Sequence, residues 1–464
     1  MKIIIVGGGI GGIAAYHSLI KNLAPTTFVQ LYEAYSPTAC RNSVLGGAIT
    51  LGPNGQRAIA SITPAAITYI RDRGFQFSTM SVRNDSGNVL AELPFGSPER
   101  YGYPSLMIPR AVVYESLMLE TNTRAHANAN IHWNKRIERV WETEEAVHVE
   151  FEDGSVECCD LLIGADGTNS KVRNALFGEE YATQYEGMTG FCGMVPLEDL
   201  SLSAQDSLRR QTSASMTLGC EGHLGLSLSS PASSSNPSLS WFTSIELPAP
   251  SMGEADPHEL KAILLEQYKD WKSPADSPES NLIAEVMSVS CSSTKKNSFL
   301  VLPRWYTPPL PHMTSLHGLT TSGCGDRDKT TGKGRIVLVG DAAHAMPPDA
   351  AQGVSLAVED ALTFALVLKH HISASKNETE SISNAARSYE DIRLTRVNKI
   401  LAGAKARQNR KKRVTPIQQW IRAKMIWMAS FIPEWFMNDE IFAYNVESQV
   451  ASHFGIVVEE LCAS

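Results

Sequence analysis

The chain has 464 residues, of which 43% are hydrophobic and 19% charged, proportions typical of a globular protein with two or three domains. Its formal net charge of −8, without a basic face large enough to neutralise many phosphates, argues against a nucleic-acid partner. The eight cysteines show neither Cys-x-x-Cys pairs nor a zinc spacing with histidine, so we predict free thiols and no metal site.

The amino terminus predicts a strand, a glycine-rich turn and a helix. Gly7, Gly9 and Gly12 form the pattern G-x-G-x-x-G between a strand at residues 3–6 and a helix at roughly residues 11–22. The glycines permit a tight turn and a close approach of the backbone to a pyrophosphate. The N-terminus of the helix offers N–H groups to the phosphates.

A second predicted strand, at residues 27–32, ends at Glu33. This carboxylate lies about twenty residues beyond the glycine motif, where it can accept hydrogen bonds from a ribose 2′-OH. The strand, turn, helix and acid together predict a dinucleotide site. A glycine-rich turn in an unrelated α/β domain is the alternative interpretation.

The middle of the chain predicts a second domain built on a sheet. Its predicted strands are residues 185–195, 214–228, 239–247 and 284–290, with a Ser/Pro-rich loop at residues 229–238 and further strand-like patches at residues 74–82 and 89–93. Tyr185, His223 and Trp241 are polar candidates for a substrate pocket on this sheet. Ordinary sheet packing would explain each of them equally well.

Two further segments repeat the order strand, tight turn, helix. One is the Asp-Gly segment at residues 160–173. The other follows a strand at residues 335–339, where Asp341 precedes small residues, the prolines Pro347 and Pro348, and a glycine before a helix. An aspartate in that position suits hydrogen bonding to a polyol chain, so we predict that the dinucleotide is a flavin.

Together, these three segments resemble the class A flavoprotein monooxygenases, the para-hydroxybenzoate hydroxylase-like family, and particularly its fungal secondary-metabolism members. The resemblance spans most of residues 1–400. It implies an α/β fold with a Rossmann-like FAD-binding domain, a β-sheet substrate domain and C-terminal helices. The expected domains are the FAD-binding domain at 1–70, 105–180 and 334–400, the substrate domain at 71–104 and 181–302, a loop insertion at 303–333, and a C-terminal helical segment at 401–464.

The resemblance also implies which residues bind the cofactor. The ADP half of FAD is assigned to Gly7, Gly9, Ile10, Gly12, Glu33 and Ala34. The remaining expected contacts are Gly47 and Ala48 beside the flavin, Arg110, Asp166 toward FAD and NAD(P)H, Asp341 at the ribityl hydroxyls, Pro348 over the flavin face, and Gly353 and Val354 at a helix start facing the pyrimidine oxygen. The two prolines could equally just end a strand–helix connection.

No catalytic acid or base is predicted. His344 belongs to a sequence common in the family, which favours a structural role over proton transfer. Some fungal relatives place an arginine in the strand that here reads Gly190-Phe191-Cys192-Gly193. Cys192 takes that place, which puts a mechanism that holds a phenolate with this arginine in doubt.

The resemblance implies an FAD-dependent monooxygenase that uses NADPH or NADH and O2. It would hydroxylate or epoxidise an aromatic, indole or polyketide-type small molecule through a flavin C4a-hydroperoxide, in secondary metabolism. A single G-x-G-x-x-G implies that the nicotinamide docks transiently. The alternatives are an FAD-linked dehydrogenase or reductase on the same scaffold and, less favoured, a flavin-binding protein without activity. The sequence does not indicate the exact substrate, the oxygenated position or the oligomeric state.

Two segments of the sequence each allow two interpretations. Residues 303–333 predict a surface insertion, or alternatively a lid over the substrate entrance. After residue 400, a basic run at residues 407–413 precedes an aromatic and methionine-rich helical stretch at residues 420–436. We expect this stretch to pack over the substrate pocket or at a dimer interface, with a position on a membrane surface as the less favoured alternative. The chain has no room for a signal peptide before its first strand and no run of eighteen apolar residues, so we expect a soluble cytoplasmic protein.

Overall fold

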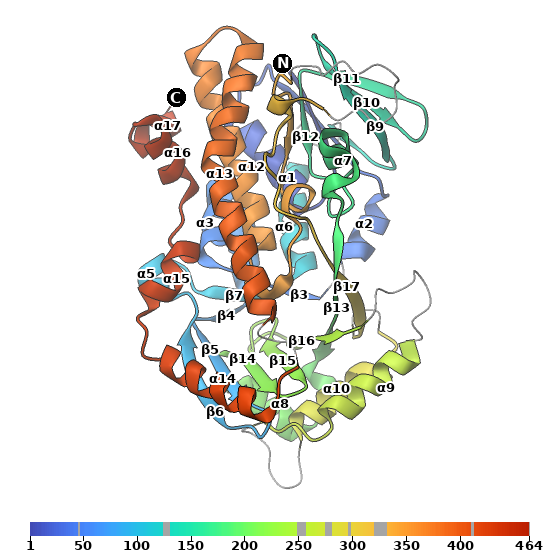
Figure 1. The fold of residues 1–464 in the computed structure, drawn as a ribbon, viewed down its shortest axis with the longest axis vertical. Coiled ribbons are helices and arrows are strands. Elements are labelled where there is room, and N and C mark those ends of the chain that lie inside the picture. The colour runs from blue at the N-terminus through green and yellow to red at the C-terminus, as the bar shows by residue number, and fades with distance from the viewer. Residues whose placement is uncertain are drawn as a thin grey trace.

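The computed structural model describes residues 1–44, 47–123, 130–247, 257–273, 281–295, 298–319, 332–409 and 413–463. Figure 1 shows a parallel sheet with its helices in the upper part of the molecule and a larger sheet in the lower part. The long helices α12 (Gly353–Ala374) and α13 (Glu378–Asn409) run together along the upper part. The predicted architecture, an α/β unit on a parallel sheet with a second sheet and C-terminal helices, is confirmed.

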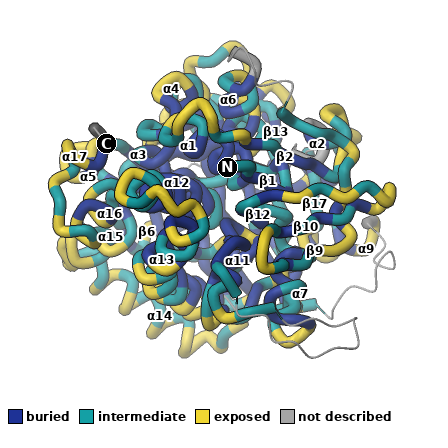
Figure 2. The backbone as a smooth tube through the Cα atoms, turned by 90° about the horizontal axis from the view of Figure 1, so that it is seen from above, coloured by how far each residue is buried: buried dark blue, intermediate teal, exposed yellow. Residues whose placement is uncertain are grey.

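The parallel sheet has the strand order β18-β12-β1-β2-β8. Its strands are β1 (Lys2–Val6), β2 (Phe28–Tyr32), β8 (Ile131–His132), β12 (Leu161–Gly164) and β18 (Ile336–Leu338). The central strands are almost entirely apolar because the sheet is buried in a core that includes residues of helix α1 (Ile10–Asn22) and of the segment at 137–151, where Phe151 stacks on Tyr32. Figure 2 shows β1, β12 and α12 in the buried interior of the molecule. The helices around this sheet also include α2 (Pro37–Val44), α3 (Pro53–Ile62), α4 (Pro64–Arg73), α6 (Arg110–Thr123), α7 (Lys171–Phe177) and α11 (Asp341–His344).

The larger sheet has seven strands in the order β17-β13-β16-β15-β14-β5-β6. They are β5 (Thr79–Asn84), β6 (Val89–Pro94), β13 (Gln184–Pro196), β14 (Ala214–Gly219), β15 (Gly222–Leu228), β16 (Ser238–Glu246) and β17 (Leu300–Tyr306). One face carries Phe191, Leu226 and Trp241, which pack in a core with helices α9 (Pro257–Tyr268) and α10 (Leu282–Ser292). The opposite face carries Cys192 and Phe242, which pair across β13 and β16.

Two small sheets complete the architecture. Strands β3 (Ala48–Leu51), β7 (Ser105–Pro109) and β4 (Phe75–Phe77) form one of them, and β9 (Ile137–Glu142), β10 (Val147–Phe151) and β11 (Val156–Cys159) form the other. The second of these is a meander that the sequence analysis did not predict. It fills the chain between β8 and β12 and packs beside α7.

Three predicted elements differ from the structure. Residues 284–290, predicted as a strand, belong to helix α10, because Asn281 caps its first turn by accepting from the N–H of Ala284 and the buried residues recur at helical spacing. Residues 214–228 form the hairpin of β14 and β15 rather than one strand. The predicted loop at 303–333 begins inside a strand, since β17 continues to Tyr306, and its residues 320–331 lie outside the described residues.

The C-terminal part is helical, as predicted, with α14 (Pro416–Ala429), α15 (Glu434–Phe442), α16 (Val446–Phe454) and α17 (Val458–Ala463). The aromatic stretch does not pack over another part of the chain, because α14 has no buried residue, and the alternative of a dimer interface stays a prediction. Within the described ranges, no helix is long and apolar enough to cross a membrane. The structure shows free thiols, as predicted, at Cys40, Cys158, Cys159, Cys192, Cys220 and Cys291.

Candidate functional site

The site lies at the carboxyl edge of the parallel sheet. Val6, the last residue of β1, pairs with Gly164 and Tyr32, and Gly164 pairs in turn with Leu338. The four strands therefore end level with one another. The segments that leave them carry the predicted residues Asp341, Asp166, Gly7 and Glu33, in this spatial order. The carboxyl edge of an open α/β sheet is where such folds bind ligands.

The glycine turn after β1 requires its glycines. Gly7 has φ +105°, and a Cβ there would lie 2.2 Å from the carbonyl oxygen of Ala165. At Gly12 a Cβ would lie 1.9 Å from the carbonyl oxygen of Gly7. Gly9 differs, because a Cβ would meet nothing within 4 Å, and no side chain caps the helix that follows it. The first turn of α1 thus presents its N–H groups to open space, as a pyrophosphate site requires.

Glu33 and the residues beside the turn have defined places. The Glu33 carboxylate is buried and accepts hydrogen bonds from the N–H of Gly8 at 2.6 Å and of Tyr35 at 2.9 Å. Ile10 is buried beneath the turn, and Ala34 is half-buried next to the acid. The structure therefore brings Glu33 against the glycine turn, as the sequence analysis expected from their spacing.

Ala357 on α12 lies where two of these turns meet. Its Cβ is 3.4 Å from the Cβ position of Gly11 on α1 and 3.1 Å from that of Gly340, the φ +60° residue before α11. A small side chain at this point lets the N-terminal turn of α1, the β18–α11 turn and α12 approach one another. The glycine-rich segment and the Asp341 segment thus share one packing contact.

Replacing Ala357 by leucine is expected to push these turns apart. Overpacking of this kind costs about 1–3 kcal/mol, and here the strain falls on the predicted cofactor site. We expect the Ala357→Leu variant to purify with less FAD, measured by absorbance near 450 nm. Ala374→Leu, the same change at an exposed position of the same helix, is the control. Equal FAD content in both variants would contradict this packing argument.

Asp166 supports the start of helix α7, whose N-cap residue is Ser170. Its carboxylate accepts hydrogen bonds from the Ser170 hydroxyl at 2.5 Å and from the N–H groups of Lys171 and Val172 at 2.8 and 3.1 Å. Burial raises the pKa of Asp166, and these hydrogen bonds act in the opposite direction. The side chain therefore holds the N-terminus of α7 in place, a role that the sequence analysis did not assign to it.

Arg173, in the same segment, connects the Asp-Gly turn to the Asp341 turn. Its guanidinium donates to the carbonyl oxygens of Thr168 at 2.7 Å and Ala342 at 3.0 Å, and the residue is buried. Asp341 itself is exposed at the first position of α11, whereas Ala342 and Ala343 behind it are buried. The carboxylate of Asp341 is thus presented at the edge of the sheet by a buried turn.

His344 lies away from this edge. Its Nε2 is 2.6 Å from the carboxylate of Asp360, and both residues are buried. The carboxylate of Asp360 also accepts from the N–H of Gly340 at 2.9 Å. These contacts agree with a structural role for His344, because they hold the turn before Asp341 against α12.

A second group of predicted residues meets at the substrate sheet. The N–H of Arg110 donates to the carbonyl oxygen of Gly47 at 3.3 Å, and Ala48 pairs with Pro109 in the small sheet. A Cβ on Gly47 would lie 2.8 Å from the sulfur of Cys192 on β13. Burial raises the pKa of the Cys192 thiol to about 11, so it is neutral near pH 7 and cannot serve as a thiolate base.

Arg304 is a residue of this region that the sequence analysis missed. It lies on β17, is buried, donates to the Ser244 hydroxyl at 2.8 Å and forms an ion pair with Asp349, directly after Pro348. Gly190 on β13 has no side chain, and the Cβ position there is 3.8 Å from the stem of Arg304. An arginine thus reaches this face from the strand beside Cys192. The sequence around Arg304, which reads Arg-Trp-Tyr at the end of a strand, contains no pattern that predicts its contact with Asp349.

Gly353 and Val354 begin helix α12, as predicted. A Cβ on Gly353 would meet nothing within 4 Å, and the first turn has no acidic residue and no side-chain cap. The side chain of the preceding Gln352 turns inward and accepts from the Asn54 amide at 2.8 Å. The N-terminus of α12 is therefore open, like that of α1, and it lies beside the Pro53–Asn54 segment.

A buried charge network, also missed in the sequence analysis, supports this helix start. Arg393 on α13 donates to Glu359 and to Asp360 at 2.8 Å each, and Arg396 donates to Glu359 at 2.8 Å. Burial by itself would raise the pKa of Asp360, but His344 and Arg393 lower it to about 2. The pKa of Glu359 is lowered for the same reason, by Arg396 and Arg393. Both carboxylates are therefore ionised in the interior.

The three polar candidates for a substrate pocket lie apart from one another on the large sheet. Trp241 faces the core with α10 and donates to the Ser290 hydroxyl at 2.8 Å, and His223 is buried in the sheet. Tyr185 is half-buried, with its hydroxyl 2.9 Å from that of Thr189. Sheet packing accounts for Trp241 and Tyr185, whereas His223 lies on the same face as Gly225, with its ring 6.5 Å from that of Phe242.

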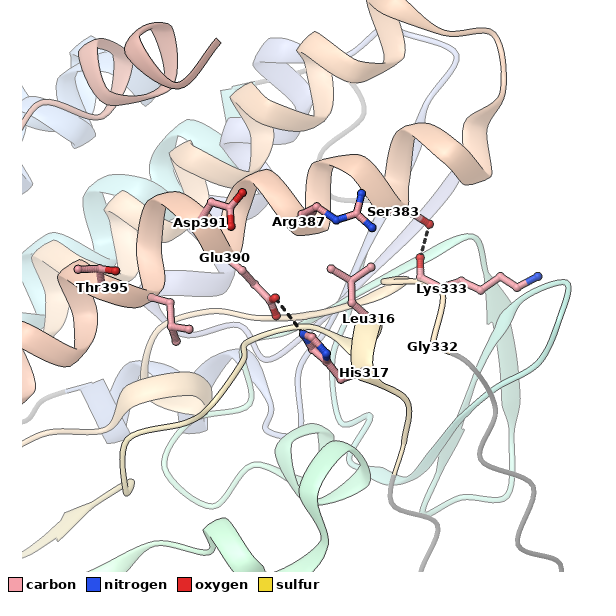
Figure 3. A pocket seen from close by; sticks show the side chains of 10 residues that line it. Leu316, His317, Gly332, Lys333, Ser383, Arg387, Glu390, Asp391 and Thr395 are labelled. Atoms are coloured by element: carbon pink, nitrogen blue, oxygen red, sulfur yellow. Dashed lines mark hydrogen bonds and ion pairs between the residues drawn. The ribbon is translucent and has the colours of Figure 1, made fainter.

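A cavity of about 710 Å³ opens elsewhere, between α13 and the chain around Leu316 and Lys333. Figure 3 shows His317 facing Glu390 across it, and the Ser383 hydroxyl donating to the carbonyl oxygen of Lys333. None of the predicted cofactor-binding residues lines this cavity. It is separate from the carboxyl edge described above.

Comparison with known proteins gives consistent results. Residues 326–404 match the family model described as FAD binding domain. The FAD-dependent monooxygenase ausM of Aspergillus calidoustus is 26% identical over 414 residues, covering 86% of this chain and 77% of that protein. The 6-hydroxynicotinate 3-monooxygenase of Bordetella bronchiseptica is 26% identical and covers 95% of this chain and 96% of its own length.

Among solved structures, Klebsiella pneumoniae HpxO complexed with FAD and uric acid is similar with a TM-score of 0.70 at 20% identity. The match covers 98% of this chain and 97% of that one, and it shows the shared fold. The matched segment contains the Asp341 turn and the start of α12. Both belong to the candidate site at the carboxyl edge of the parallel sheet. The chain therefore carries an FAD binding domain, is similar along most of its length to FAD-dependent monooxygenases, and is an FAD-dependent oxidoreductase.

Proposed function

We propose that this flavoprotein uses NADPH or NADH and O2 to hydroxylate or epoxidise an aromatic, indole or polyketide-type small molecule in secondary metabolism. One oxygen atom enters the substrate, and the other leaves as water with two electrons and one proton from the nicotinamide and one proton from solvent. The observation that carries the proposal is the contact between the carboxyl edge and the substrate sheet, where Cys192 touches Gly47 and Arg304 pairs with Asp349.

The residues at the edge fit an FAD molecule. We assign its pyrophosphate to the open N-terminus of α1 at Gly9 and Ile10, and its ribose to Glu33 beside Ala34. The turn formed by Gly7 and Gly12 leaves no space for a side chain, which a close approach of the backbone to the phosphates requires. When bound, FAD would accept hydride and activate oxygen, and no side chain can do either.

The flavin ring is assigned to the space near Gly47, Ala48, Arg110, Pro348 and the start of α12. The open N-terminus of α12 at Gly353 and Val354 carries a partial positive charge, which would stabilise negative charge on the reduced ring. Pro348, with its fixed φ, is held in place through its neighbour Asp349 and Arg304. We assign the ribityl hydroxyls to Asp341, and we assign Asp166 to the support of the cofactor through α7.

The substrate is assigned to the face of the large sheet that carries Cys192, Phe242 and Gly225. Cys192 pairs with Phe242, and Phe242 with Gly225, so the three share one face. The ring of Phe242 covers Gly225, where a Cβ would lie 2.2 Å from the ring. A neutral thiol, an aromatic ring and a bare glycine make a largely apolar wall, which favours an apolar or aromatic substrate.

The decisive experiment supplies the FAD-loaded protein with NADPH and ¹⁸O₂ in the presence of a metabolite extract from its source. We expect mass spectrometry to find a product heavier by one labelled oxygen atom. A reduced product formed with NADPH oxidation, or a desaturated product formed without NADPH oxidation as its electrons pass to O2, each without label, would favour the dehydrogenase or reductase and contradict the proposal. NADH in place of NADPH in a parallel reaction identifies the preferred donor.

A further inference from the structure

Helix α14 is amphipathic, but its polar side faces the protein and its apolar side is exposed. Its inward side is polar: Gln419 donates to the carbonyl oxygen of Leu218 and Arg422 to that of Gly219, both at 2.8 Å. Its outward side carries Ile417 and Trp420, which are 74% and 63% exposed. The apolar stripe of a surface helix normally faces the core. Here it faces away from the protein.

The outward apolar surface continues onto α15. We call it the aromatic patch and define it by Trp420, Trp427, Met428, Phe431, Trp435 and Phe436, which are 53–70% exposed. Polar contacts again hold the inward side, since Glu434 accepts from the N–H of Ser97 at 2.9 Å and Asn438 donates to the carbonyl oxygen of Pro94 at 2.9 Å. Figure 1 shows α14 and α15 at the outer margin of the molecule, with α14 beside β6. The patch is thus displayed by anchored helices.

We propose that the aromatic patch docks the protein on the surface of a lipid bilayer that contains anionic lipids. The charges of this region suit such a surface. Residues 407–433 contain seven Arg or Lys and no Asp or Glu, although the whole chain has a net charge of −8. Basic residues beside an apolar face with Trp and Phe are the pattern of helices that lie in the plane of a membrane interface. Three of the eight tryptophans are in the patch, and tryptophan prefers this interface.

Lys424 favours a bilayer over a second copy of the chain as the occupant. It is exposed within the patch, with its ammonium 5.7 Å from the centre of the Trp420 ring. Lysine is depleted from the cores of protein–protein interfaces, because its ammonium would lose its water there. At a bilayer, the apolar stem of Lys424 can lie along Trp420 while the ammonium reaches the lipid phosphates.

The test is flotation of the FAD-loaded full-length protein with vesicles. One set contains phosphatidylcholine with a third of phosphatidylserine, and the other contains phosphatidylcholine alone. We expect the wild-type protein to float with the first set at low salt. The triple variant Trp420→Ser, Phe431→Ser, Phe436→Ser is expected to lower the partition coefficient at least about 100-fold, from the apolar area that it removes. Lys424→Ala should lower it about fivefold, on the anionic vesicles alone.

The matched control is the triple variant Phe28→Ser, Leu202→Ser, Val457→Ser, which removes three exposed apolar side chains outside the patch and should float like the wild type. FAD absorbance reports that each variant is folded. Wild-type protein that stays unbound with both vesicle sets at low salt would overturn the proposal. So would a wild-type dimer in sedimentation velocity that only the patch variant dissociates, without any flotation, since a second copy would then be the occupant.

Discussion

The Arg393→Leu variant is expected to lose about 3–5 kcal/mol of its free energy of unfolding, the usual cost of leaving a buried charge without its partner. Arg393 is fully buried and binds two ionised carboxylates, Glu359 and Asp360, at 2.8 Å each. Leucine fills part of the space but leaves Asp360 with His344 and Gly340 as its partners. Urea unfolding followed by circular dichroism measures the loss.

The pH dependence of this variant adds a second readout. In the wild type, the folded pKa of Asp360 is about 2, below its ordinary value of 3.8. A lowered pKa contributes stability that is complete above pH 4 and is lost as the pH falls toward 2. Without Arg393 the pKa of Asp360 rises, so we expect acid unfolding of the variant to begin at a higher pH. Arg387→Leu, an exposed change on the same helix, should alter neither measurement. Equal stability of Arg393→Leu and Arg387→Leu would contradict the importance of the network.

The site illustrates which parts of the structure the sequence predicts. The glycine turn and the segments around Glu33, Asp166 and Asp341 were predicted because each is local. An apolar strand followed by a short turn specifies both its own conformation and the edge from which it leaves. Parallel pairing then brings four such turns together, and the register of β1 with its neighbours places them level.

Features that depend on partners distant in sequence were missed. Arg304 meets Asp349, and Arg393 meets Glu359 and Asp360, across tens of residues and between different elements. Isolated arginines gave no sign of these contacts, although Arg393 and Arg396 lie one helical turn apart and so share a face. The strand predicted at residues 284–290 failed for a related reason: a short apolar run suits a buried helix as well as a strand, and the capping residue Asn281 decides between them.

The aromatic stretch near the C-terminus shows that a sequence pattern can predict a helix without predicting its packing. Its helical periodicity was predicted, and α14 and α15 form. Periodicity states that the apolar residues share a face, but it does not state what that face contacts. Only the hydrogen bonds of Gln419 and Arg422 on the opposite side reveal that the apolar face points outward. The predicted helices are therefore confirmed, whereas their apolar face does not pack within the chain, and the predicted dimer interface is untested.

The Asp341→Ala variant is expected to lose most of its bound FAD. The buried turn of β18 and α11 presents this carboxylate at the edge of the sheet, where we assign the ribityl hydroxyls. Hydrogen bonds to a charged group contribute about 1.5–3 kcal/mol each, so the Kd for FAD should rise roughly 10- to 150-fold. Titration of apoprotein with FAD, followed by flavin fluorescence, measures the change.

Two comparison variants make this result specific to the carboxylate. Asp341→Asn keeps one oxygen acceptor without the charge, so its Kd should lie between those of the wild type and Asp341→Ala. Asp391→Ala removes an exposed carboxylate from α13 and should leave the Kd unchanged. Circular dichroism of the apoproteins should be the same for all, since the side chain of Asp341 is exposed and the turn is held by Arg173 and His344. An Asp341→Ala protein that purifies with full yellow absorbance would show that the ribityl chain binds elsewhere.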